Sequence, residues 1–92
     1  MSKPEELRLR ILVHLEQHSR ADSGTYVNDT DLATATGASV EEVRRQLDIL
    51  EAQGLTREAN SMGQHSAIIS PAGSLAIEGV MDTVPAKRKI GF

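Results

Sequence analysis

The apolar residues between positions 4 and 19 follow the spacing of an amphipathic helix. Leu7, Ile11 and Leu15 recur every four residues, which places them on one face. Pro4 suits the first turn of a helix, where a backbone N–H has no helical partner. Further apolar residues widen this face beyond one stripe: Leu9, Leu12 and Val13. We therefore expect this helix to lie at the centre of the core or to form part of a homodimer interface.

A shorter helix is predicted to follow between Asn28 and Gly37. Asn28 has the position of an N-cap, with Asp31 as its acidic partner three residues later. Gly37 ends the helix, as glycine commonly does at a helix C-terminus. The apolar residues of this helix are Leu32, Ala33 and Ala35.

The next helix, residues 40–53, has a stronger signature. Ser39 and Glu42 form the Ser-x-x-Glu pattern of a capping box. Its core-facing side is predicted by residues spaced i, i+4 and i+7: Val43, Leu47 and Leu50. Gly54 ends the helix. Two helices joined by a tight glycine-containing turn are typical of a helix-turn-helix.

The pattern changes after Leu55. Residues 55–69 alternate weakly around a turn signal at Gly63, which predicts a β-hairpin, and residues 25–27 predict a very short strand. Ser70-Pro71 opens a last helix, whose apolar side is formed by Leu75, Ala76, Ile77 and Val80. The predicted fold is mainly α with a small β wing, in the order helix, short strand, helix, helix, β-hairpin, helix.

Composition indicates one domain and an ordinary soluble protein. Ninety-two residues permit a single modest core, which we assign to residues 1–81, with residues 82–92 as a basic tail. Aromatic residues make up only 2% of the chain, so the core is expected to be aliphatic. No segment approaches the ~20 apolar residues of a membrane span, and the N-terminal residues lack a signal-peptide pattern. With no cysteine in the chain, we expect a cytoplasmic protein without membrane contact.

The charge is distributed unevenly. Lys87, Arg88 and Lys89 lie in the tail, whereas residues 1–82 hold 7 basic and 13 acidic side chains, a net charge of −6. A protein that coats duplexes non-specifically would show the reverse balance. The tail has three interpretations: a phosphate-seeking arm, a segment that docks Ile90 and Phe92 on another subunit, and a solvated end.

Neither an enzyme nor a cofactor is indicated. The chain has no glycine-rich phosphate loop and no nucleophile elbow. His14 and His18 share a helix face at i, i+4, which is a spacing that can hold a metal. Glu16 points about 200° away from His14 around the helix, and His65 is distant in sequence. We therefore interpret the histidines as surface residues and predict no metal site.

The segment 31–55, DLATATGASVEEVRRQLDILEAQGL, resembles the helix-turn-helix of bacterial and archaeal winged-helix regulators. The likeness rests on Leu32-Ala33, Gly37, Val43, Leu47, Leu50 and Gly54-Leu55. After the wing, these families often carry isoleucine or leucine, then threonine, two variable residues and glycine. Ile69-Ser70-Pro71-Ala72-Gly73 fits that pattern with serine in place of threonine. The resemblance covers residues 5–81 and implies a small transcriptional regulator that binds double-stranded DNA as a homodimer.

The resemblance also implies which residues contact DNA. The helix over residues 39–53 would lie in the major groove. The expected contacts are with base edges or phosphates from Arg44, Arg45 and Gln46, with phosphates from Thr36, Ser39 and Arg57, and with the minor groove from Gln64. The basic residues Lys87, Arg88 and Lys89 would add phosphate contacts.

The same residues support an alternative. Arg45 is spaced to pair with Glu41 and Glu42 within the helix, and Arg44 with Asp48. Glu41 and Glu42 also complement the helix dipole. The predicted wing, residues 60–65, has no arginine or lysine. These features favour a protein-interaction module, and RNA or ribosome association through the tail is a third interpretation.

Overall fold

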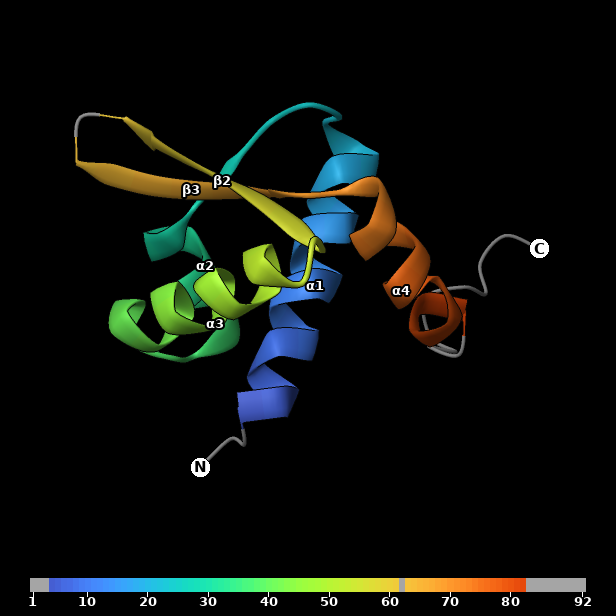
Figure 1. Ribbon diagram of the computed structural model, residues 1–92, viewed down its shortest axis with the longest axis horizontal. Coiled ribbons are helices and arrows are strands. Elements are labelled where there is room, and N and C mark those ends of the chain that lie inside the picture. The colour runs from blue at the N-terminus through green and yellow to red at the C-terminus, as the bar shows by residue number, and fades with distance from the viewer. Residues whose placement is uncertain (1–3, 62, 83–92) are drawn as a thin grey trace.

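The computed structural model describes residues 4–61 and 63–82 of the chain. Its described part contains four helices and a three-stranded antiparallel sheet. In chain order these are α1 (Pro4–Ala21), β1 (Val27–Asn28), α2 (Asp29–Thr36), α3 (Val40–Ala52), β2 (Thr56–Ser61), β3 (Gln64–Ile69) and α4 (Pro71–Asp82) (Figure 1). The predicted tail lies outside the described residues from residue 83 onward.

Helix α1 is the centre of the arrangement. It contacts α2, α3, α4 and β3, and Figure 1 shows α2 and α3 on one side of it and α4 on the other. Ile11 and Leu15 on α1 are fully buried, as the four-residue spacing predicts. The other large, fully buried apolar side chains come from α2, α3 and α4: Leu32, Val43, Leu47, Leu50 and Ile77. The core is therefore aliphatic, as expected, and Tyr26 is exposed.

The sheet has the strand order β1-β3-β2. The hairpin pairs Thr56 with Ile69 at its base and Ser61 with Gln64 at its tip. The short strand β1 pairs with the other side of β3 through Val27 with Ala67 and Asn28 with Ser66. The β2–β3 hairpin extends beyond the helices on the side of α2 and α3 (Figure 1).

Helix starts agree with the sequence in one case and differ in another. Ser39 Oγ accepts a hydrogen bond from the Glu42 N–H at 3.1 Å, and the Ser39 N–H donates to Glu42 Oε1 at 3.4 Å, so the capping box is confirmed. Asn28 is the N-cap residue of α2, but its side chain makes no capping hydrogen bond. Asn28 has the extended backbone usual for an N-cap residue and also pairs with Ser66 as the last residue of β1.

The apolar side predicted for α4 is only partly buried. Ile77 is buried and Val80 is half-buried against the core. Leu75 is 72% exposed and Ala76 is also exposed, so the expectation that all four residues share one side is wrong. The reason is geometric: residues 75 and 77 lie about 200° apart on a helix.

No helix in the described residues is long and apolar enough to cross a membrane.

Candidate nucleic-acid interface

The candidate site is built on α2, α3 and the turn between them. Gly37 has a φ of +79° and its N–H donates to the Ala33 carbonyl at 2.9 Å, which closes α2 and redirects the chain. A non-glycine residue rarely adopts that backbone conformation. The buried residues of α3 then face the core, which leaves the opposite side of this helix in solvent. That side carries Glu41, Arg45, Asp48 and Ala52, all of which are exposed.

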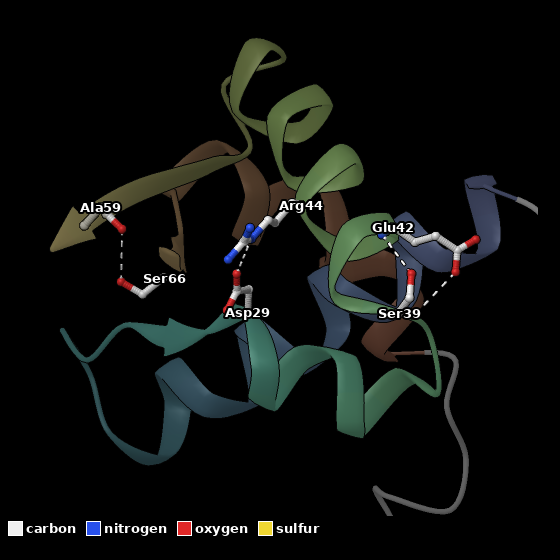
Figure 2. A network of polar contacts seen from close by, with 6 residues as sticks. All are labelled: Asp29, Ser39, Glu42, Arg44, Ala59 and Ser66. Atoms are coloured by element: carbon white, nitrogen blue, oxygen red, sulfur yellow. Dashed lines mark hydrogen bonds and ion pairs between the residues drawn. The ribbon is translucent and has the colours of Figure 1, made fainter. Parts of the chain in front are cut away.

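Arg44 has a partner on another helix. Its Nε donates to Asp29 Oδ2 at 2.6 Å, which joins α3 to the first residue of α2 (Figure 2). The predicted pair with Asp48 is therefore wrong. Asp29 lies 15 residues earlier in the chain, so helical spacing alone gives no signal for this contact.

Arg45 is exposed, and its side chain has no hydrogen bond or ion pair with the described residues. The predicted pairs with Glu41 and Glu42 are thus not formed. Glu42 is instead engaged in the capping box with Ser39. The guanidinium of Arg45 is available to a ligand at the middle of the outward side of α3.

Gln46 does not belong to the exposed side. It is 5% exposed, and its Oε1 accepts from Arg8 Nη1 of α1 at 2.7 Å. The prediction that Gln46 contacts DNA is therefore contradicted. Its burial follows from its position, because Gln46 lies three residues after Val43 and four before Leu50, on the core side of the helix.

The hydroxyl groups of Thr36 and Ser39, both predicted to contact phosphates, differ in whether their protons are free to donate. Thr36 is half-buried and its Oγ1 donates to the Leu32 carbonyl at 2.7 Å, so its proton is already used. Ser39 is exposed and its Oγ accepts from Glu42, which leaves its own proton free. Of the two, Ser39 can still donate to a phosphate oxygen.

The hairpin places two predicted residues at opposite ends. Arg57 pairs with Ile68 near the base, and Gln64 pairs with Ser61 at the tip. Both are exposed, and neither side chain has a hydrogen bond or ion pair within the part of the chain that the structure describes. Lys87, Arg88 and Lys89 lie outside the described residues.

An acidic cluster that the sequence did not indicate lies beside the second half of α3. It consists of Asp48 and Glu51 on α3 and Glu58 on β2, whose N–H donates to Glu51 Oε2 at 3.3 Å. Partial burial, followed by the charges of Asp48 and Glu51, raises the pKa of Glu58 to about 7. These three acids reduce the positive potential that Arg44 and Arg45 give to this surface.

The histidines contribute no metal site to the described structure. His14 and His18 are half-buried on α1. Within residues 4–61 and 63–82 no group of three or more histidine, aspartate or glutamate side chains is placed to hold a metal ion.

No protein-family model matches this chain, and no curated protein matches it. Among solved structures, it is similar to the 1.70 Å crystal structure of a protein from Ralstonia eutropha JMP134 described as a "putative DNA-binding protein". The TM-score is 0.74 and the sequences are 18% identical, over 82% of this chain and 94% of that chain. The two proteins share a fold. At this identity the likeness concerns the fold and leaves the function of the present chain to its own residues.

Proposed function

We propose that this protein is a winged helix-turn-helix domain that binds double-stranded DNA, with α3 in the major groove and the β2–β3 hairpin as its wing. The order of elements and the fold shared with a "putative DNA-binding protein" support this assignment. As a second step we propose that it is a small transcriptional regulator that acts as a homodimer in the cytoplasm. A dimer would read two half-sites with two copies of α3.

The observation that carries the DNA proposal is the free guanidinium of Arg45. It lies on the side of α3 that faces away from the core and has no partner in the described residues. A guanidinium presents two parallel donors that match a phosphate or the O6 and N7 atoms of guanine. Ser39 at the start of α3 and Arg57 near the base of the hairpin are also exposed, and in this proposal both donate to phosphates. Gln64 at the hairpin tip is the remaining candidate, for the minor groove.

Fluorescence anisotropy of labelled duplex fragments across a salt series tests this proposal. We expect Arg45→Ala to weaken binding about 5- to 100-fold, the range for losing one good guanidinium contact. Arg10→Ala is the control, because it removes the same charge from an exposed position on α1, where the only hydrogen bond lost among the described residues is a long one, 3.5 Å, to the Thr36 carbonyl; it is expected to change affinity less than about twofold. If the wild-type chain does not bind duplexes even at low salt, or if both variants behave alike, the proposal is wrong.

A second candidate function has its own supporting observation. The exposed charged residues of α3 are four acids, Glu41, Glu42, Asp48 and Glu51, against two arginines. Such a surface suits a basic protein segment better than a polyanion.

The same measurement separates the two candidates. If the second candidate function is correct, a labelled lysine- and arginine-rich peptide will bind the wild-type chain. The double variant Glu41→Gln/Asp48→Asn will lose that binding, and duplex DNA will not bind. Binding of the duplex with loss in Arg45→Ala contradicts it.

A further inference from the structure

The ion pair between Asp29 and Arg44 joins a buried group to an exposed one. The Asp29 side chain is 4% exposed, whereas that of Arg44 is 45% exposed. The bond between them, Arg44 Nε to Asp29 Oδ2 at 2.6 Å, is short even for a charge-assisted hydrogen bond. Figure 2 shows the Arg44 side chain leaving α3 and reaching down to the start of α2.

Asp29 is held in place by more than one interaction. It is the first residue of α2, where the helix dipole favours a negative charge. A buried carboxylate also needs a hydrogen-bonded cation nearby, which Arg44 supplies. Asp29 is therefore a fixed anchor, and whatever is bound to it takes up a fixed position.

The contact uses only part of what the arginine can donate. A guanidinium has five N–H donors, and the bond to Asp29 takes the one on Nε. The four donors on Nη1 and Nη2 have no acceptor among the described residues. Arg44 is thus bound through Nε and remains 45% exposed, at the edge of the outward side of α3 that carries Arg45.

We propose that Asp29 is a positioning residue for DNA binding, which holds the Arg44 guanidinium so that Nη1 and Nη2 meet a pair of acceptor atoms on the duplex. This inference rests on the proposed function and names a second contact of the same surface. An arginine that is already ordered loses less conformational freedom when it binds. Two adjacent terminal nitrogens fit a pair of acceptors, either the oxygens of one phosphate or O6 and N7 of one guanine.

The proposal and simple electrostatics make opposite predictions for one substitution. Asp29→Ala removes a negative charge next to DNA, so electrostatics alone would strengthen binding. If Asp29 positions Arg44, the same substitution releases the guanidinium and weakens binding. Asp29→Asn is the matched control, since its side-chain oxygen can still accept from Arg44 Nε.

The experiment is duplex anisotropy on the full chain with a double-mutant cycle of Asp29→Ala and Arg44→Ala. We expect Asp29→Ala to weaken binding at least fivefold on its own and to have no further effect when Arg44→Ala is present. Asp29→Asn is expected to keep at least half of the wild-type affinity. Arg44→Lys keeps the charge but lacks separate donors for Asp29 and for the duplex. We expect it to lose as much affinity as Arg44→Ala. Circular dichroism at the assay temperature establishes which variants are folded.

Each possible result either supports or contradicts the positioning role of Asp29. Stronger binding by Asp29→Ala, or an equal loss with and without Arg44, overturns the proposal and leaves Asp29 as a structural tie between α2 and α3. If Asp29→Ala is unfolded, Asp29→Asn and Arg44→Lys decide: retained binding in the first and loss in the second support the proposal, and any other pair contradicts it. A loss confined to particular duplex sequences indicates guanine, and a uniform loss indicates phosphate. Absence of duplex binding by the wild-type chain would instead refute the proposed function itself.

Discussion

Partial burial of the Glu58 carboxyl group, and after it the charges of Asp48 and Glu51, raise the pKa of Glu58 to about 7. In an unfolded chain the same group titrates near 4.5. The folded protein therefore binds this proton more tightly than the unfolded chain does. By linkage, the stabilisation from protonated Glu58 is complete below pH 4.5 and is lost as the pH rises to about 7.

This sign gives a prediction for Glu58→Gln, which replaces the carboxyl by a neutral group of the same shape. We expect the variant to be more stable than the wild type at pH 8 and nearly equal to it at pH 4.5. The gain at pH 8 is at most about 1 kcal/mol, because Glu58 is partly exposed and solvent screens its neighbours. Thermal unfolding at the two pH values measures the difference, with the exposed Glu78→Gln on α4 as control. Equal effects at both pH values would contradict the raised pKa.

Single residues of the candidate site were predictable only where a local pattern places them. The burial of Gln46 follows from its spacing to Val43 and Leu50, so helical periodicity alone is enough to predict it. No sequence pattern indicates the contact between Asp29 and Arg44, because it depends on how α2 packs against α3. The cluster of Glu58 with Asp48 and Glu51 is likewise set by how β2 leaves the end of α3.

Among the elements, the start of α4 is the place where close packing is most demanding. Ser70 Oγ donates to the Gly54 carbonyl at 2.6 Å and accepts from the Gly73 N–H at 3.0 Å, which ties this helix to the end of α3. A Cβ on Gly73 would overlap the Leu55 carbonyl oxygen and lie 2.7 Å from Ile69 Cγ1. The Ser-x-x-Gly segment after the hairpin is thus explained by packing of α4 against the α3–β2 connection.

We therefore expect Gly73→Ala to lower the free energy of unfolding by about 1–3 kcal/mol, the usual cost of overpacking. Gly79→Ala is the matched control on the same helix, since a Cβ there meets nothing within 4 Å. That control should gain about 0.5–1 kcal/mol from helix propensity. Urea unfolding of both variants measures the contrast. Two variants of equal stability would show that α4 can move away from Leu55 at little cost.

The elements themselves were largely predictable, because each is specified by periodicity and by its end residues. The helix expected over 40–53 corresponds to α3 with its capping box, and the hairpin turn lies where Gly63 indicated it. Periodicity could not predict which residues of a wide apolar face are buried and which are exposed. Leu9 and Leu75 resemble core residues in the sequence but are exposed, because the choice among apolar positions is made by the neighbouring elements. Whether those exposed side chains meet in a homodimer remains a prediction.

For the whole molecule, net charge is the property that most limits the proposed binding to DNA. Residues 1–82 carry a net charge of −6, and residues 87–89 reduce the total to −3. A domain of this charge repels a polyanion at long range, so binding depends on short-range contacts and on whatever positive charge the C-terminal residues contribute.

Truncation after Asp82 tests that dependence. If Lys87, Arg88 and Lys89 contact phosphates, the shortened chain will bind all duplexes more weakly, and the slope of log affinity against log salt will fall by about 0.9 for each lost contact, or up to about 3 in total. The preference among duplex sequences should stay the same, because phosphate contacts carry no base information. Replacing all three residues by serine in the full chain is the control for length. An unchanged salt slope in both variants would remove these residues from the interface and assign the whole of the binding to α3 and the hairpin.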